Sequence, residues 1–503
     1  MKTLKLIIFV FIAITLNGCE GKLDLTNPNK PTGETFWKTE ADFRQAMASC
    51  YTPLKNWNGG YYGTRGLMTR ISRADDIEFR NDIQEIYSMH RFTNDPNNAV
   101  ANNIFYQFYN AIYRANSILQ EIDGKDFTEE FIDQIRGEAL FIRGMYYFQL
   151  AKEFGDVPLR LTASQDPATF QLAKSSQAEV YGQAEKDFIE SASLLPLAND
   201  KGKPTRGTSY AYLGKLYVYM EKWQDAKNTL EPLTKAPYTY KLVDDFTWNF
   251  DEEEHENNAE SIFEILYEPV GGSDQWDNGE TANSAQSTTI AVEYAAGAVG
   301  GWFEAKPTQK MMDIFRKERA ANGEYDYRTL TSVAWDYPGC MYYMKPIQEV
   351  LSGEDLASYW ILKYQNSKTR EQEVETIPSY INERAMRFAD VILLLAECEL
   401  NLNNTVQAIG YIDQIRTRGG NLLPYSGKTD AASVKEELIH QRAIEFFKEG
   451  ERFYDLRRWG LLEQELKAQD PIRFASFQKR HYYLPIPAKE IQTNLLCTQN
   501  GDW

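Results

Sequence analysis

The chain carries the stretch Arg136-Gly-Glu-Ala-Leu-Phe-Ile-Arg-Gly-Met-Tyr-Tyr-Phe-Gln-Leu-Ala-Lys-Glu-Phe-Gly-Asp-Val-Pro158. Its apolar residues recur at helical spacing and predict one long helix from Glu129 to Phe154. Gly155, with a proline three residues later, is a typical helix stop. Tyr146 and Tyr147 fall within this pattern, so we expect both rings in the core.

Charged residues within such helices favour structural ion pairs over an active site. Next to Ala, Phe and Tyr, they more often tie packed helices together in partly buried positions. The set to which we apply this interpretation is Arg136, Glu138, Arg143, Arg387, Asp390, Glu397, Glu445, Glu451 and Arg452.

The same periodicity predicts helices towards both ends of the chain. They are Ala41–Leu54, Ile104–Ile122, Gln177–Leu195, Thr208–Glu221, Trp223–Thr234, Arg387–Leu402, Val406–Arg418, Ala431–Phe447 and Glu451–Leu466. The middle of the chain is rich in Gly, Asn, Asp, Trp and Tyr, with short apolar runs such as Ile262–Tyr267, which indicates loops and short strands. The sequence therefore predicts a mostly α body, with helical segments at about 35–237 and 381–466 and an irregular region at about 238–380.

One helical pair fits the tetratricopeptide pattern. Tyr210-x-x-Leu-Gly214-x-x-Tyr217 is followed by Ala226 and Leu230, and small residues twelve apart let two antiparallel helices approach closely. The same offset separates Ala396 from Ala408. The sequence predicts tetratricopeptide-like helix pairs.

The N-terminus resembles a lipoprotein signal. Lys2 and Lys5 precede a short apolar run that stops at Asn17-Gly18-Cys19, and this run is too short to cross a bilayer. We interpret residues 1–18 as a signal peptide and Cys19 as the lipidated first residue of a body spanning residues 19–503. An ordinary cleavable signal with an unmodified cysteine is the alternative. Attachment of two or more acyl chains to Cys19 would anchor the body stably to a membrane.

Composition argues against nucleic-acid binding. The formal charge is −18 with a pI near 4.9, and it becomes −20 once Lys2 and Lys5 leave with the signal. Such a body repels phosphate backbones. Cys50, Cys340, Cys398 and Cys497 show no CxxC spacing, so buried thiols and one or two disulfides both stay open.

Evidence for an enzyme is sparse. Four histidines lie far apart, and the chain has no HExxH, GxSxG or P-loop motif. The acidic run Asp251–Glu256 is interpreted as a solvated loop, because a cation site needs oxygens that converge. We predict no catalytic residue, metal or cofactor. A pair of glycosidase carboxylates stays open as an alternative, since carboxylates are abundant.

Several ordered blocks resemble the SusD/RagB family of surface lipoproteins. They are Leu23–Pro28, Thr35–Phe43, Arg136–Pro158, Glu260–Ile265, Arg387–Glu397, Glu445–Trp459 and Tyr483–Pro487, and they cover essentially the whole mature chain. The resemblance implies a SusD-like fold and a non-catalytic protein that captures nutrients, mostly glycans, for a SusC-like TonB-dependent transporter. It also implies a lipid-anchored, surface-exposed position on the outer membrane.

Ligand contacts are expected from aromatic residues in loops, because sugar rings stack on flat aromatic faces and such platforms lose little entropy. Neighbouring Gly and Asn residues indicate exposed turns. The alternative is that each ring is structural and packs on the core beneath its loop. The candidates are Trp57, Tyr61, Tyr62, Asp75, Asp76, Trp276, Trp302, Trp335 and Tyr337.

The sequence thus favours a glycan-binding lipoprotein that works by capture and release. Two alternatives stay open: a helical-repeat lipoprotein that binds a peptide or protein for the same kind of transporter, and a lipoprotein glycoside hydrolase. The sequence does not reveal the geometry of the loops, and this geometry determines the ligand.

Overall fold

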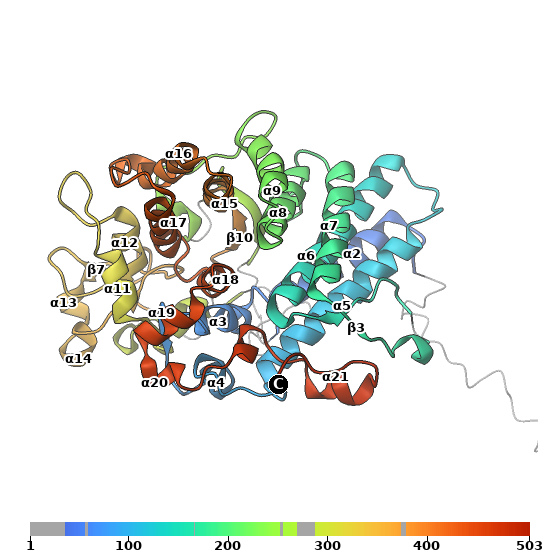
Figure 1. Cartoon of the computed structure of the whole chain (residues 1–503), viewed down its shortest axis with the longest axis horizontal. Coiled ribbons are helices and arrows are strands. Elements are labelled where there is room, and N and C mark those ends of the chain that lie inside the picture. The colour runs from blue at the N-terminus through green and yellow to red at the C-terminus, as the bar shows by residue number, and fades with distance from the viewer. Residues whose placement is uncertain (1–35, 56–58, 165, 252–254, 269–286, 374–378) are drawn as a thin grey trace, which may run out of the picture.

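Helices dominate the fold, as Figure 1 shows for the computed structural model. The structure describes residues 36–55, 59–164, 166–251, 255–268, 287–373 and 379–503. Among these residues, no helix combines the length and the apolar character needed to cross a bilayer. The prediction of a mostly α protein is confirmed.

The long predicted helix is α6 (Glu129–Phe154). The Thr128 side chain caps its first turn by accepting a hydrogen bond from the Phe131 N–H, and Gly155 ends it with φ +76°. Tyr146 and Tyr147 are both fully buried, which confirms the core prediction. The helix packs on α5 (Ala99–Glu121), α7 (Gln177–Leu194) and α2 (Glu40–Lys55).

A continuous row of helices extends from α7 across the molecule (Figure 1). Each member packs on the next: α7, α8 (Arg206–Tyr219), α9 (Trp223–Leu230), α15 (Phe388–Asn401), α16 (Thr405–Arg416) and α17 (Ala431–Glu445). Gly214 and Ala226 lie at the α8–α9 contact, and Ala396 and Ala408 are buried in α15 and α16. The two predicted close helix pairs are present.

Adding one methyl group at Gly214 is expected to destabilise the protein. A Cβ there would lie 2.3 Å from Leu230 Cγ, so Gly214→Ala should lower the free energy of unfolding by about 1–3 kcal/mol. Gly182 in α7 is the matched control, because its Cβ would meet no atom within 4 Å. Gly182→Ala should raise stability by up to about 1 kcal/mol. Urea denaturation of both variants measures this difference, and equal midpoints would contradict close packing at Gly214.

The irregular region forms short two-stranded sheets and short helices. β4 (Ser261–Ile265) pairs antiparallel with β10 (Glu383–Arg387), which confirms the strand expected near Ile262. Two further antiparallel pairs lie within this region: β6 (Val333–Ala334) with β9 (Trp360–Ile361), and β7 (Met341–Tyr342) with β8 (Lys345–Pro346). Elsewhere in the chain, β1 (Ile77–Phe79) pairs with β5 (Ala305–Pro307) of this region, and β2 (Val157–Pro158) pairs with β3 (Lys174–Ser175). The short α-helices described in the irregular region are α10 (Ile290–Tyr294), α11 (Gln309–Phe315), α12 (Tyr327–Ser332), α13 (Ile347–Val350) and α14 (Gly353–Leu356).

The prediction of one continuous helix over Glu451–Leu466 is wrong. The structure has α18 (Arg452–Arg458) and α19 (Leu462–Gln469), separated by Gly460 at φ +71°. A left-handed residue cannot continue an α-helix, and glycine adopts that conformation without steric cost. The sequence prediction also omitted α3 (Thr64–Ser72), α4 (Gln84–His90), α20 (Pro471–Phe474) and α21 (Ala488–Thr493).

Ion pairs between helices occur where the charged blocks predicted them. Arg143 pairs with Asp187, and Arg458 pairs with Glu397. Arg387 is 1% exposed and contacts three carboxylates. The four described cysteines are buried free thiols, and burial raises the pKa of Cys50 to about 12.

Candidate functional site

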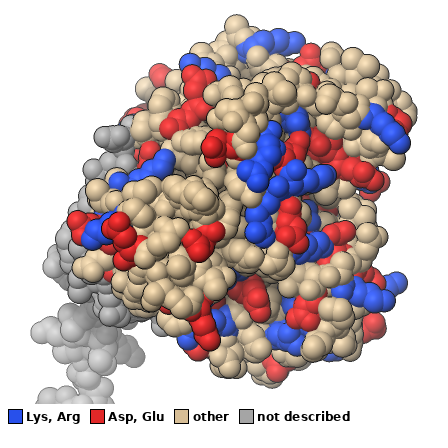
Figure 2. Space-filling model, turned by 90° about the vertical axis from the view of Figure 1, so that its left-hand side faces the viewer, with Lys and Arg blue, Asp and Glu red and all other residues tan. Residues whose placement is uncertain are grey.

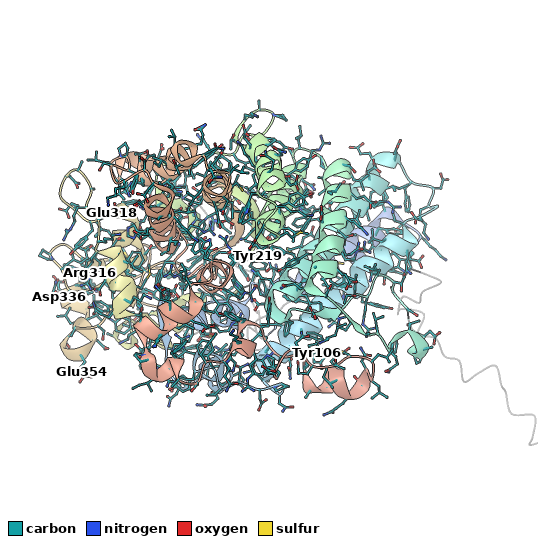
Figure 3. All side chains as sticks on the ribbon, in the orientation of Figure 1. Tyr106, Tyr219, Arg316, Glu318, Asp336 and Glu354 are labelled. Carbon is teal, nitrogen blue, oxygen red and sulfur yellow. The ribbon has the colours of Figure 1, made fainter. Side chains whose placement is uncertain are left out.

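A surface cavity of about 400 Å³ opens in the irregular region. It lies between the turn η3 (Phe246–Asn249), helix α12, the β7–β8 hairpin and the segment 362–369. Figure 3 labels Asp336 next to this hairpin, at the left edge of the molecule. The volume falls within the range of small-molecule sites, about 300–1,000 Å³.

Apolar side chains form one wall of the cavity. Phe250 is buried beneath it, whereas Tyr327 is 36% exposed and Met341 and Met344 are each 52% exposed. Tyr337 adds a half-buried ring. Covering one such side chain with ligand is worth up to about 1.5–3 kcal/mol, so the wall favours a ligand with apolar surface.

The neighbouring edge of the cavity, residues 365–369, is polar, and buried atoms without a described hydrogen-bond partner lie there. Gln365 and Asn366 are buried, and Gln365 Nε2 and Asn366 Oδ1 have no hydrogen-bond partner in the described part of the chain. Asp251 Oδ1 is likewise buried without a described partner. The amide, hydroxyl and ammonium groups of the lining residues 365–369 suit a ligand with hydroxyl groups, which both donate and accept.

Hydrogen bonds fix the mouth of the cavity. Lys368 Nζ donates to Thr247 Oγ1 at 2.9 Å, and the Tyr327 hydroxyl donates to Asp245 Oδ1 at 2.9 Å. Burial, with the Asp245 carboxylate, raises the pKa of Tyr327 to about 12, so its hydroxyl stays protonated at neutral pH. These bonds hold α12 and η3 at a fixed separation across the opening.

A strained turn presents the two methionines. Tyr343 and Met344 join β7 to β8 with φ +49° and +65°, a conformation that hairpin turns usually give to Asn and Gly. Non-glycine residues held there cost on the order of 1–3 kcal/mol each. The buried Tyr343 hydroxyl lies 2.8 Å from Gln365 Oε1 and 3.0 Å from Glu373 Oε1 and can donate its one hydrogen to either. The polar edge therefore anchors the turn that displays the apolar wall.

An exposed indole lies beside the cavity. Trp248 follows the cavity-lining Thr247 in η3 and is 37% exposed. Its ring stacks on His255 at 4.4 Å and 5°, and His255 Nδ1 lies 2.7 Å from Asp251 Oδ2. This arrangement places a flat aromatic platform next to the polar edge.

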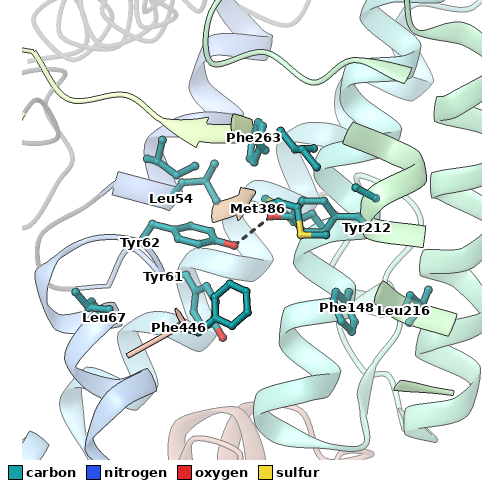
Figure 4. Close-up of a cluster of buried hydrophobic side chains, with 14 of the residues drawn as sticks. Leu54, Tyr61, Tyr62, Leu67, Phe148, Tyr212, Leu216, Phe263, Met386 and Phe446 are labelled. Carbon is teal, nitrogen blue, oxygen red and sulfur yellow. Dashed lines mark hydrogen bonds between the residues drawn. The ribbon is translucent and has the colours of Figure 1, made fainter. Parts of the chain in front are cut away.

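The expectation that Tyr61, Tyr62, Asp75 and Asp76 form an exposed cluster is wrong. All four are buried, because α3 folds back over Tyr61 and Tyr62. Figure 4 shows both rings among core side chains, with Tyr62 bonded to the Tyr212 hydroxyl at 3.3 Å. A Cβ on Gly66 would lie 2.1 Å from the Gly60 carbonyl oxygen, so only glycine permits this close fold.

Buried hydrogen-bond and ion-pair partners hold Tyr61 and Asp75 in place. The Tyr61 hydroxyl donates to Glu153 at 2.7 Å. The Asp75 carboxylate accepts from Arg452 at 2.9 and 3.0 Å and contacts Lys310 at 2.8 Å. These are ties in the core, and none of the four lines the cavity.

The other predicted residues have separate positions. Tyr337 lines the cavity, and Trp335 is 6% exposed and packs behind it with ring centroids 4.3 Å apart. Trp302 is half-buried and lies outside this cavity. Trp57, Trp276 and Cys19 lie outside the described residues.

Sequence reasoning missed Tyr327, Met341, Met344 and Trp248. Met341-Tyr-Tyr-Met344 between Gly339 and Pro346 was an available signal, because Gly and Pro mark a turn there and the segment between them carries two methionines. No local sequence pattern predicts that residues 247, 327, 344 and 368 come together around one cavity.

The face of the molecule with α11 and the hairpin is not uniformly acidic. Figure 2 shows Lys and Arg side chains gathered across the middle of this face, with Asp and Glu interspersed. Two other cavities, of about 540 and 560 Å³, lie at α2. Among the described residues, no cluster of His, Cys, Asp and Glu could hold a metal ion.

Comparison with known proteins identifies relatives over the whole chain. A family model described as "SusD family" matches residues 259–503, and one described as "Starch-binding associating with outer membrane" matches residues 23–218. SusD-like protein P25 of Formosa agariphila is 25% identical, with all of both chains covered.

Solved structures share the fold. The crystal structure of a SusD superfamily protein from Bacteroides vulgatus is 57% identical, has a TM-score of 0.87, and is matched over 93% of this chain and 100% of that chain. Surface glycan-binding protein A from Bacteroides thetaiotaomicron, in complex with laminarihexaose, is 21% identical with a TM-score of 0.73, over 92% of this chain and 99% of that chain. At that identity the second likeness carries the fold alone.

Proposed function

Because this chain belongs to the SusD family of non-catalytic binding proteins, we propose that it captures an oligosaccharide in the cavity between Tyr327 and Tyr337. The protein then releases this ligand, without any covalent step, to a SusC-like TonB-dependent transporter of the outer membrane. Cys19 carries the lipid anchor, and the body faces the cell exterior.

The observation that carries this proposal is that aromatic rings and a polar segment line one cavity. Tyr327 and Tyr337 offer ring surface, while residues 365–369 supply amide, hydroxyl and ammonium groups. A sugar presents the same combination, an apolar C–H face edged by hydroxyls. The starch-binding family description supports a glycan as the ligand class.

Calorimetric titration tests the proposal. The chain from Glu20 to Trp503 is titrated with starch, laminarin and other plant, host and microbial glycans and their oligomers. Saturable heat with one glycan class supports it. Absence of heat across the panel contradicts glycan capture and favours the peptide-binding alternative, which a pull-down of the membrane complex would then examine.

Removing the Tyr337 ring should weaken glycan binding. The ring lines the cavity, and stacking contacts of aromatic rings contribute about 0.5–1.5 kcal/mol beyond their buried area. With the area term, Tyr337→Ala should raise Kd by about tenfold or more. Phe170→Ala, which removes a 45% exposed ring far from the cavity, is the control and should leave Kd unchanged. Equal affinities for the two variants would place the ligand elsewhere.

Trp302 stays a second candidate contact. Its carbonyl oxygen accepts from Arg80 at 2.8 Å, and Arg80 also covers the Phe303 ring at 3.8 Å. If Trp302→Ala weakens binding and Tyr337→Ala does not, the glycan site lies at this segment and the cavity has another role.

A further inference from the structure

One side of the cavity exposes more apolar side-chain surface than stacking against an unsubstituted sugar needs. Sugar rings stack on flat aromatic faces, and Tyr337 and Tyr327 supply such faces. Met341 and Met344 add two thioether side chains that have no flat face, and half of each is exposed to water. Unbranched methionine adapts its shape to small irregular apolar groups.

The position of these methionines is held from the polar edge. The Met344 N–H donates to the Ser367 carbonyl at 3.1 Å, and the Tyr343 hydroxyl reaches Gln365 and Glu373. Both turn residues have positive φ, and neither is glycine or asparagine. The fold therefore fixes an apolar surface beside the polar segment 365–369, instead of letting it collapse into the core.

We propose that the cavity recognises an O-acylated glycan, with the acyl group of the sugar covered by Met341 and Met344. This inference rests on the proposed function and specifies its ligand class. The sugar hydroxyls face the polar segment 365–369, and the ester methyl faces the apolar wall of Met341 and Met344. A hydroxyl in place of the ester would leave that wall wet, so the acylated form binds more tightly.

Matched ligands test the inference. Naturally O-acetylated xylo-oligosaccharides and O-acetylated glucomannan oligosaccharides are each divided, and one aliquot is saponified with dilute alkali. Calorimetry then gives the Kd of the chain from Glu20 to Trp503 for both aliquots. We expect at least one acetylated pool to bind about tenfold more tightly than its saponified aliquot, a difference of about 1.4 kcal/mol.

A double variant assigns the preference to the methionines. In Met341→Thr/Met344→Asn, threonine suits the strand and asparagine tolerates the left-handed turn. The ratio of the two Kd values should fall to about twofold or less. Val406→Ser removes a 76% exposed apolar side chain in α16 and should keep the wild-type ratio. Circular dichroism establishes that each variant is folded.

Each remaining outcome overturns the inference. Equal affinity for both aliquots, tighter binding of the saponified aliquot, or no binding to any acetylated pool does so, as does a tenfold preference that survives in the double variant. Proposed glycan capture is judged separately, because it stands if an unsubstituted glycan of the panel binds and fails if no glycan binds.

Discussion

Replacing Arg387 with alanine is expected to lower the free energy of unfolding by about 3–5 kcal/mol. The Arg387 guanidinium is 1% exposed and donates to Glu449 Oε2 at 2.8 Å, Glu260 Oε1 at 2.7 Å and Glu445 Oε1 at 2.6 Å. Removing it leaves buried carboxylates short of a counter-charge, and this cost exceeds the loss of the hydrogen bonds themselves.

Neighbouring cations do not replace the missing charge in full. Arg328 and Arg418 also contact Glu445, at 3.1 and 2.9 Å. Among the described residues, however, the Glu449 carboxylate retains only Lys363 as an ion-pair partner, at 2.6 Å. In the wild type, burial and the Arg387 charge lower the pKa of Lys363 to about 8, so the folded protein gains stability as Lys363 loses its proton between pH 7 and pH 9. Without Arg387 the pKa of Lys363 rises, and the variant gains less stability over this range. The difference in unfolding free energy between wild type and variant should therefore be larger at pH 9 than at pH 7.

Urea denaturation at both pH values measures the effect. Arg44→Ala is the matched control, because Arg44 is half exposed and pairs with Glu40 one turn away, an arrangement worth less than about 1 kcal/mol. A loss at Arg387 no larger than that of the control would show that the network is solvated in solution.

The helical body could be predicted because its signals are local. The 3.6-residue period and the Gly155 stop define α6, and small residues twelve apart define the α8–α9 contact. The split between α18 and α19 was missed, since a single Gly460 inside an amphipathic pattern does not reveal its left-handed backbone.

The candidate site could be predicted only in part. Tyr337 was found because Pro338 and Gly339 mark a turn, but its cavity joins segments near residues 250, 327, 344 and 366 that are distant in the chain. Such closure depends on tertiary packing, which composition and periodicity do not encode. Tyr61 and Tyr62 resembled loop aromatics for the converse reason: Gly60 and Gly66 serve a close backbone crossing that buries both rings.

Asp76 should make the protein less stable as the pH rises, and Asp76→Asn should remove that effect. Asp76 is 4% exposed, and burial together with the neighbouring Asp75 charge raises its pKa to about 7. The ordinary pKa of aspartate is about 3.9. Below about pH 4, Asp76 is protonated in the folded and unfolded chains alike, so it imposes no penalty.

Between about pH 4 and pH 7 the unfolded chain releases this proton before the folded chain does, and the resulting penalty grows until Asp76 ionises in the fold. A shift of roughly three pKa units corresponds to a penalty on the order of 4 kcal/mol above pH 7. Asparagine keeps the shape without the charge. Asp76→Asn should thus be more stable than the wild type by a few kcal/mol at pH 8, with the gap closing towards pH 4.

The difference between variant and wild type at each pH isolates this one group, because the other carboxylates titrate in both chains. Asp200→Asn, at a side chain that is 80% exposed, is the control and should show no gap at any pH. A gap at Asp76 that does not change between pH 4 and pH 8 would mean that the substitution acts through packing or hydrogen bonding. A gap that grows with pH would instead identify Asp76 as a carboxyl group that burial and the Asp75 charge keep from ionising, whereas Arg452 and Lys310 contact the Asp75 carboxylate directly.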